Sequence, residues 1–196
     1  SLSSAASDVL RDRYKEFEFN LIRYFGITSS IGKTDFESQD EVKLVNKLYK
    51  EILENYERKN LENVNKVFPI IKNVYENPKN KYERIVVPFT DGKKTMNIVT
   101  NLNNAYDSKG KELIDDFEKN ITLAIIDETW KTHLRKMDEL RQSVLLAVHE
   151  QKDPLLIYKF ESFELFKNMT SSLNRDIISF LLKGNIPSQN PSIQEA

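Results

Sequence analysis

The sequence of 196 residues contains no cysteine and only two histidines and five glycines. Without cysteine it has no disulfide framework, no thiol nucleophile and no cysteine-ligated zinc site, and this composition is compatible with a reducing cytosol. The scarcity of glycine and histidine leaves little material for phosphate-binding loops or metal clusters. No apolar run approaches the roughly 20 residues that span a bilayer, and the first residues lack a signal-peptide pattern. These absences favour a helical module over an enzyme.

An excess of positive charge is also missing. The chain carries 29 Lys and Arg against 30 Asp and Glu, which gives a formal net charge of −1. A nucleic-acid platform would show a clustered basic excess, so nucleic acid is not predicted as a primary partner. Eleven Phe, eight Tyr and one Trp are enough to fill one or two modest cores. Because the first residue is Ser rather than Met, we expect a piece cut from a longer protein.

The first half of the chain has mixed character. Residues 14–24 place aromatic and aliphatic side chains at helical spacing, and Gly26 then ends the predicted helix. We interpret the polar residues 27–40 as a loop. Residues 42–74 show apolar positions three or four apart, which predicts an amphipathic helix, broken or bent near Pro69.

A change of period follows in residues 82–102. Runs of β-branched and aromatic residues flank the turn sequence Thr90-Asp91-Gly92-Lys93. Asp-Gly between two such runs is a strong hairpin signal, so we predict a β-hairpin here. Pro88 has no N–H to donate, which implies an edge strand or a bulge at its position.

The second half reads as two long helices. Apolar residues recur at helical spacing from Lys111 onward, and Asp153-Pro154 is a suitable opening for a second helix that Gly184 and Pro187 end. Two such helices with a short connector form an antiparallel pair about 45 Å long. The predicted fold class is therefore mainly α: a long antiparallel two-helix hairpin plus a smaller helical domain that carries a β-hairpin.

Three sequence patterns could indicate phosphate binding, metal binding or acid–base catalysis, and we interpret each as structural. Gly32-Lys33-Thr34 resembles the end of a phosphate-binding loop, but five residues rather than four separate Gly26 from Gly32, so we predict an ordinary loop. His133 has no second ligand at zinc-helix spacing, and we interpret it as structural or surface-exposed. Asp127, Glu128, Asp138 and Glu139 are expected to pair with basic residues one turn away. We predict no catalytic residue and no metal site.

Aromatic residues mark the two long helices. Trp130 and the row Phe160, Phe163 and Phe166 lie at helical spacing, so we predict that they are core residues that hold the helices together, with Trp130 largely buried. The connector, residues 143–153, begins with apolar side chains. Two interpretations stay open: an exposed tip that contacts another chain, or a continuation of the first helix that caps the core of the pair.

Two groups of residues in the second half of the chain each match a spaced sequence motif. The first group matches the pattern D-x-x-W-K/R-E-H-L-x-x-M-D-x-L-R except at Thr132, where the pattern has Glu, and the second matches Q-K-D-P-x-x-x-Y-K-x-E-x-F-x-x-F. The residues concerned are Asp127, Trp130, His133, Leu134, Met137, Asp138, Arg141, Gln151, Lys152, Asp153, Pro154, Tyr158, Lys159, Glu161, Phe163 and Phe166. This combination resembles SecA, the bacterial preprotein translocase motor, over about residues 115–183. The upstream stretches YKEFEFNLIRYFG, IIKNVYEN and VPFTDG are similar to SecA chains of the Bacteroidetes type.

The resemblance implies an organisation. Residues 1–110 would be a helical wing domain, residues 111–186 a two-helix finger at the C-terminal part of the helical scaffold, and residues 187–196 a flexible tail. It implies that ATP and magnesium bind to upstream domains of the parent protein, so that this chain holds no cofactor and is no enzyme by itself. The implied partners are the SecYEG channel, a preprotein, and the upstream ATPase and scaffold domains of the same chain. The implied location is the cytoplasm and, peripherally, the cytoplasmic face of the inner membrane.

The resemblance also assigns a tip to the finger. Ala147, Val148, His149 and Glu150 would contact the channel and the moving polypeptide, and we expect them to be exposed and poorly ordered. His149 stands where family members commonly carry a tyrosine. A rival hypothesis is a stand-alone helical adaptor that binds a partner helix along its aromatic row.

Overall fold

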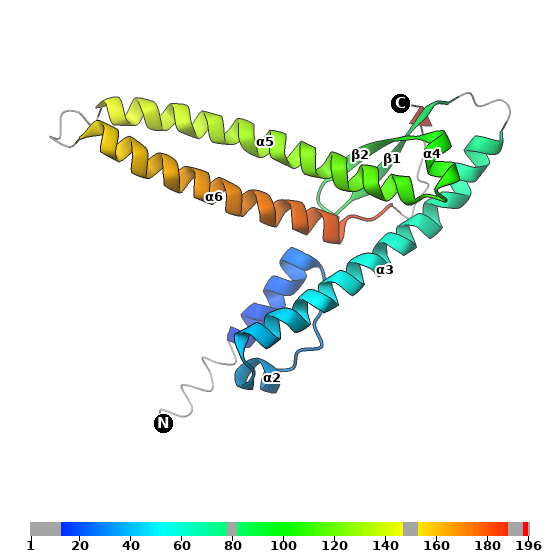
Figure 1. The fold of residues 1–196 in the computed structure, drawn as a ribbon, viewed down its shortest axis with the longest axis horizontal. Helices are drawn as coiled ribbons and strands as arrows, with labels where there is room; N and C mark the ends of the chain where they lie inside the picture. Colours follow the sequence, from blue (N-terminus) through cyan, green and yellow to red (C-terminus); the bar gives the residue numbers. More distant parts are fainter. Residues whose placement is uncertain (1–12, 78–81, 147–152, 188–193, 196) are drawn as a thin grey trace. The chain divides into compact units, whose positions relative to one another are not determined.

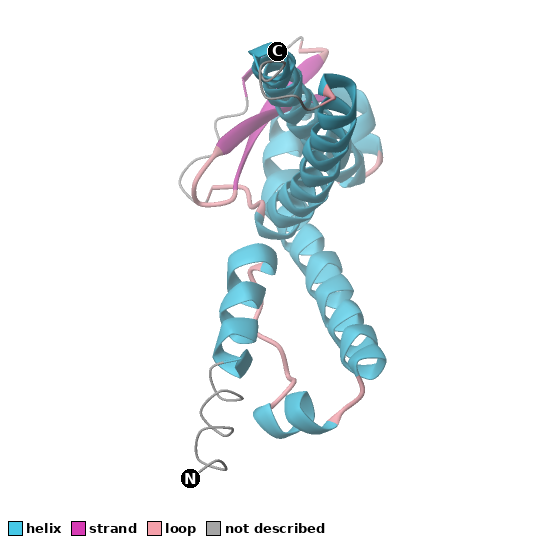
Figure 2. Cartoon of the chain, turned by 90° about the vertical axis from the view of Figure 1, so that its left-hand side faces the viewer, coloured by secondary structure: helices cyan, strands magenta, loops and turns pink. Residues whose placement is uncertain are grey.

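The computed structural model describes residues 13–77, 82–146, 153–187 and 194–195 (Figure 1). Helix predominates, and the strands form one small sheet (Figure 2). The predicted mainly α fold class, with a two-helix hairpin and a β-hairpin, is confirmed. The chain forms two compact units: residues 1–117 together with 179–196, and residues 118–178.

The first unit begins with a helix over residues 13–20 that continues as the π-helix η1, Leu21–Phe25. Gly26 ends it as predicted, with φ at 67° and its N–H donated to the carbonyl of Ile22. Residues 27–40 are not wholly a loop, because α2 spans Lys33–Ser38. Phe36 of α2 packs on Phe17 at 4.9 Å between ring centroids. This tertiary contact anchors a short helix that polar composition alone does not predict.

The loop before α2 is fixed to α3, which spans Glu41–Glu76. Ile31 is buried, and Glu51 of α3 accepts a hydrogen bond from Ser29 Oγ at 2.5 Å and another from the Ser30 hydroxyl. α3 continues through Pro69, so the predicted break does not occur. Proline removes one helical hydrogen bond, and the fully buried side chains of Val67 and Ile71 hold the turns on either side.

The predicted hairpin is confirmed as β1, Arg84–Thr90, and β2, Thr95–Asn101. In its turn, Gly92 has φ at 88°, and Asp91 Oδ1 accepts the N–H groups of Lys93 and Lys94 at 2.8 Å each. After the hairpin, α4 spans Leu102–Asp107, and the Asn101 side chain caps it.

The expectation that Pro88 marks an edge strand or a bulge is wrong. β1 is the middle strand of the order β2-β1-β3, and its register with β2 has no bulge. β3, Gln194–Glu195, pairs only with Ile85 and Val86, and Thr90 forms a separate bridge with Asn185. Thr90 donates its N–H to Asn185, on the side of β1 away from β2. Because N–H groups two residues apart point to the same side of a strand, the nitrogen of Pro88 faces this side too. It lies between the β3 pairing and the Asn185 bridge, where no hydrogen bond is needed.

Aromatic stacking builds the core of the first unit. Phe89 of β1 stacks on Phe117 at 4.2 Å between ring centroids, and Phe117 lies 6.3 Å from Phe180. Ile85, Val87, Ile98 and Leu113 are also completely or almost completely buried. The hairpin therefore covers the ends of the two long helices, which supplies the neighbours that an isolated hairpin needs.

These helices are α5, Lys111–Leu146, and α6, Pro154–Lys183, and they run antiparallel (Figure 1). α6 begins at Pro154 as predicted, and Asp153 Oδ1 accepts the N–H groups of Leu155 and Leu156 at 2.9 and 3.4 Å. Its end at Gly184 is also as predicted, since the Gly184 N–H returns to the carbonyl of Phe180 at 2.7 Å. The turn expected at Pro78 lies outside the described residues.

Candidate functional site: an exposed apolar face on two helices

The second unit, residues 118–178, holds most of both long helices. Their shared seam consists of buried and half-buried side chains that recur every three or four residues. On α5 these are His133, Met137, Leu140 and Val144, and on α6 they are Tyr158, Ser162, Leu165, Met169 and Ser172. This spacing is typical of left-handed helix pairing. The seam mixes apolar side chains with a histidine, a tyrosine and two serines.

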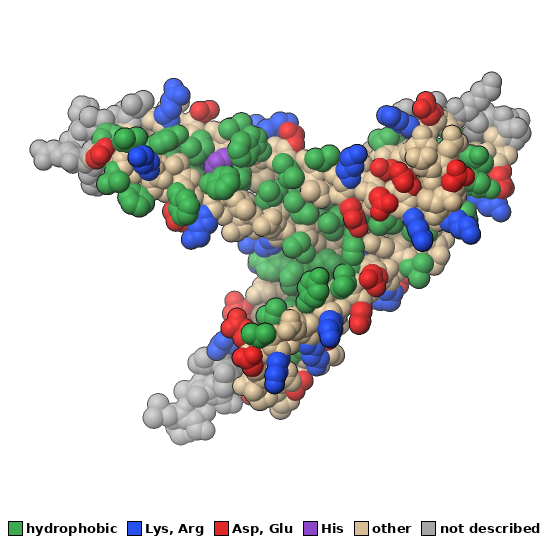
Figure 3. All heavy atoms as spheres, viewed as in Figure 1, with side chains coloured by type: hydrophobic (Ala, Val, Ile, Leu, Met, Phe, Trp, Pro, Cys, Tyr) green, Lys and Arg blue, Asp and Glu red, His purple; other side chains and the backbone are tan. Residues whose placement is uncertain are grey.

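A second set of side chains on the same helices is more apolar and yet exposed. On α5 it includes Trp130, 47% exposed, and on α6 it includes Phe160 and Phe163, 66% and 63% exposed. The other members are Leu123, Ile126, Leu134, Leu155, Leu156 and Phe166. We call this set the apolar face. Figure 3 shows hydrophobic side chains gathered over both helices around the purple histidine.

His133 ties the seam to this face. It is 7% exposed, and its ring lies 5.5 Å from Trp130 on its own helix and 6.0 Å from Phe166 on the other. Trp130 of α5 and Phe166 of α6 therefore both lie beside the ring of His133. The Nδ1 atom of His133 is buried and has no hydrogen-bond partner among the described residues. Of the two positions expected for His133, structural or surface-exposed, its burial excludes the exposed one.

The prediction that Trp130 and the phenylalanine row form the core of the helix pair is wrong. Trp130, Phe160, Phe163 and Phe166 are 47%, 66%, 63% and 49% exposed. Helical spacing locates an apolar stripe without saying what covers it. The pair instead closes on the neighbouring, less apolar stripe that contains His133, and the most aromatic stripe is left open.

Several polar motif residues are exposed to solvent. Asp127 pairs with Lys131 one turn on, at 2.6 Å. Asp138, Arg141, Lys159 and Glu161 are exposed. Such exposed pairs contribute little stability. The tip residues Ala147, Val148, His149 and Glu150, with Gln151 and Lys152, lie outside the described residues.

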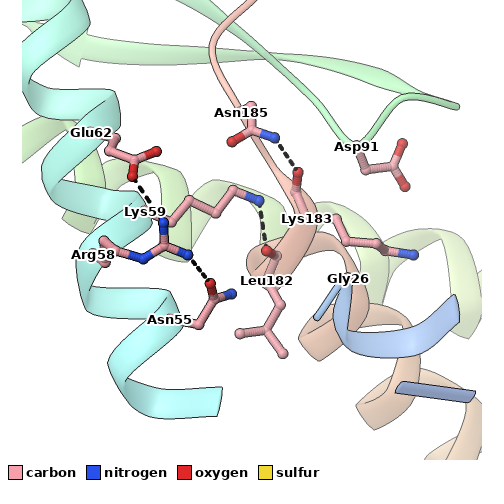
Figure 4. A pocket seen from close by; sticks show the side chains of 9 residues that line it. All are labelled: Gly26, Asn55, Arg58, Lys59, Glu62, Asp91, Leu182, Lys183 and Asn185. Atoms are coloured by element: carbon pink, nitrogen blue, oxygen red, sulfur yellow. Dashed lines mark hydrogen bonds and ion pairs between the residues drawn. The ribbon is translucent and has the colours of Figure 1, made fainter. Parts of the chain in front are cut away.

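Sequence reasoning missed a polar pocket of about 360 Å³ in the first unit, where α3, the hairpin turn and the end of α6 meet (Figure 4). Lys59 of α3 donates to the carbonyl of Leu182 at 2.6 Å. The pKa of Lys59 is lowered to about 8, chiefly by desolvation on burial; Glu62 opposes this shift, and the positive charges of Lys183 and Lys66 add to it. The residues concerned are more than a hundred positions apart, so local sequence patterns carry no signal for this contact.

Two further features bear on chemistry. Over the described ranges, no group of three or more His, Asp or Glu side chains is arranged to hold a metal ion. No helix within those ranges has the length and apolar character to cross a membrane.

Comparison with known families decides where this architecture belongs. The model of the SecA Wing and Scaffold domain matches residues 7–185. The chain belongs to the SecA family. The resemblance carried by the two motif groups is therefore confirmed, including its Bacteroidetes type.

Several SecA proteins align with this chain over nearly its whole length. It is 59% identical over 183 residues to the protein translocase subunit SecA of Flavobacterium psychrophilum, and 59% identical over 184 residues to that of Christiangramia forsetii. These alignments cover 93% of this chain. The SecA of Parabacteroides distasonis is 42% identical over 193 residues, or 98% of the chain. This chain spans only 16% to 17% of the length of these relatives. No solved structure matches.

Proposed function

We propose that this chain is the wing and finger region of a SecA-type, ATP-driven protein-translocation motor. In this proposal, residues 1–110 form the wing and residues 111–186 the finger, which contacts the SecYEG channel and the translocating preprotein. The region also couples to the ATPase domains and restrains them. ATP and magnesium bind elsewhere in the parent protein, and the motor works at the cytoplasmic face of the inner membrane.

The observation that carries the proposal is the exposed apolar face. Soluble proteins rarely leave large contiguous apolar patches open, so such a patch indicates an interaction site. Phe160, Phe163 and Trp130 are each about half or more exposed. Because the relatives are about six times longer than this chain, the covering surface has an obvious source. We assign it to the upstream ATPase and scaffold domains of the same protein.

The finger's length supports its mechanical role. α5 has 36 residues and α6 has 30, and an α-helix rises about 1.5 Å per residue. Paired helices of this length transmit a displacement along their axis without bending sharply. A short tip of mixed polarity at their far end suits contact with polypeptides of many sequences. We assign this contact to Ala147, Val148, His149 and Glu150.

The restraint of ATP hydrolysis is tested on the apolar face in the full-length motor. Phe160→Gln combined with Phe163→Gln should weaken the contact with the upstream domains, raise basal ATP hydrolysis several-fold and reduce transport. Glu164→Gln changes an exposed residue of the same helix and should leave both rates at the wild-type level. Unchanged hydrolysis and transport in the double variant would show that the face is not part of the motor's coupling.

The tip is tested by transport itself. His149→Ala should reduce preprotein transport more than basal ATP hydrolysis, because it removes a polypeptide contact and not a nucleotide contact. His149→Tyr should preserve or raise transport. Wild-type transport by His149→Ala would remove this residue from the tip's function.

The second candidate function is a helical adaptor that binds a partner helix along the same aromatic row. The exposure of Phe160 and Phe163 is compatible with it, since such rows dock into grooves of partner proteins. Sequencing the gene around this region distinguishes the two functions. Nucleotide-binding motifs upstream in the same reading frame support the motor, and their absence supports the adaptor.

A further inference from the structure

The chain leaves α6 as a short extended segment, residues 184–186, that lies between α3 and β1 in the first unit. Its backbone contacts alternate. The carbonyl of Gly184 and the N–H of Ile186 meet α3, whereas Asn185 exchanges two hydrogen bonds with Thr90 of β1, each 2.8 Å long. This alternation is that of a strand between two partners. One of the partners, however, is a helix.

Asn63 makes the helix side of this pairing. Its side chain is 1% exposed, its Nδ2 donates to the carbonyl of Gly184 at 3.3 Å, and its Oδ1 accepts the N–H of Ile186 at 3.2 Å. The side-chain amide of Asn63 thus takes the place of a neighbouring strand. It pairs with two backbone groups, the Gly184 carbonyl and the Ile186 N–H, that lie two residues apart. A buried asparagine in a helix interior is costly unless its side chain is paired, and here both of its ends are.

Lys59 extends the contact by one turn. It precedes Asn63 by four residues, so both side chains leave the same side of α3. Its ammonium donates to the carbonyl of Leu182 at 2.6 Å, near the end of α6, where unpaired carbonyls favour a cation (Figure 4). Figure 4 shows Lys59 reaching from α3 to this carbonyl, while Arg58 turns to Asn55 and Glu62.

Close packing fixes the same segment from a third side. A Cβ atom on Gly184 would lie 2.6 Å from Cζ of Phe117, in the first turns of α5. Only glycine permits this approach. Ile186 is 2% exposed. The ends of both long helices are therefore held by one set of contacts in the first unit.

We propose that Asn63 and Lys59 are positioning residues: they clamp the backbone that leaves α6 onto α3, so that a displacement of the wing is delivered to the finger. The transmission follows from chain continuity, because both α5 and α6 contribute residues to each unit. The coupling part of this inference rests on the proposed motor function. The clamp itself does not.

The test uses the full-length motor carrying Asn63→Leu. Leucine has the same branched side-chain skeleton as asparagine and favours the helix, and it leaves the Gly184 carbonyl and the Ile186 N–H unpaired. Asn46→Leu, at an exposed position of α3, is the matched control. If Asn63→Leu does not fold, Lys59→Met removes the adjacent contact without touching the buried core. Amide hydrogen exchange of residues 184–186, ATP turnover and transport per ATP are measured on each variant.

We expect exchange at residues 184–186 to accelerate about tenfold or more in the clamp variant, because two buried backbone groups lose their partner. Transport per ATP should fall about threefold or more, the size of effect typical of coupling changes, while ATP turnover stays near wild type. The control should change neither quantity.

Exchange at the control level would overturn the clamp. Faster exchange with unchanged transport per ATP would show a purely structural contact and overturn the coupling, while the proposed motor function stands. A wild-type motor that moves no preprotein would overturn the motor function and the coupling together, whatever the exchange result.

Discussion

The two units of this chain treat their apolar side chains in opposite ways. In the first unit, Phe89 and Phe117 are completely buried and stacked. In the second, Phe160 and Phe163 are more than 60% exposed, and the seam between the helices mixes polar with apolar side chains. The first unit thus has its own core, whereas the second leaves its most apolar side chains exposed. Under the proposed function, the upstream domains of the motor cover this exposed face.

The largest expected effect contrasts two phenylalanines. Phe117→Ala should lower the free energy of unfolding by about 3–5 kcal/mol, because it removes a fully buried ring from between Phe89 and Phe180. Phe160→Ala should change it by no more than about 0.5 kcal/mol, as for other surface substitutions. Urea denaturation measures both values. Equal losses would abolish the contrast between the units.

Gly184→Ala is the next largest. The new methyl group would lie 2.6 Å from Phe117 Cζ and 3.0 Å from the carbonyl of Phe180, so something must move. We expect a loss of about 1–3 kcal/mol, as for other overpacked sites. Gly32→Ala is the control, since a Cβ there would meet nothing within 4 Å. Thermal unfolding of the two variants shows whether the segment after α6 is as tightly packed as described.

Lys59 gives the first unit a pH dependence. Its pKa is lowered from 10.5 to about 8, chiefly by desolvation. Between these values the unfolded chain binds more protons than the folded chain, so stability should rise with pH over this window. After an allowance for partial exposure, we expect a rise of about 1–2 kcal/mol.

The lysine's share is isolated by subtraction. Stability is measured by urea denaturation from pH 7.5 to 10, and the curve for Lys59→Met is subtracted from that of the wild type. Parallel curves would mean that the Lys59 ammonium is not desolvated.

A small effect is also expected for the tryptophan. Trp130 is 47% exposed, so Trp130→Ala should cost this chain only about 1 kcal/mol, far less than the cost of removing a buried aromatic. Differential scanning calorimetry of the variant is the measurement. A loss comparable to that of Phe117→Ala would place Trp130 in a core and remove the distinction between the units.

Local chemistry made much of the fold predictable. The Asp-Gly turn, the Asp153-Pro154 helix opening and the glycine at the end of η1 each act within a few residues, and each lies where the sequence indicates. α2 was not predicted, because its anchor is the contact between Phe36 and Phe17 and not its own composition. The clamp was not predicted either, since Asn63 and its partners are separated by more than 120 residues.

The apolar face shows a different limit. Periodicity located the stripe of Trp130, Phe160 and Phe163 correctly but assigned it to the wrong partner. A stripe one position away, through His133 and Met137, also recurs every three or four residues, and it is the one that closes the pair. Hydrophobicity indicates which face gains the most free energy when it is removed from water. Under the proposed function, the upstream domains of the motor bury this face.

The most direct test of this account is the accessibility of position 160, which the absence of native cysteine makes simple in this chain. Phe160→Cys, with Glu164→Cys as the control on the same helix, is labelled with a maleimide in this chain and in a cysteine-free full-length motor. We predict rapid labelling of both positions in this chain. In the full-length motor, position 160 should be protected and position 164 should not. Equal labelling of position 160 in the two proteins would contradict the claim that the apolar face is covered by the rest of the motor.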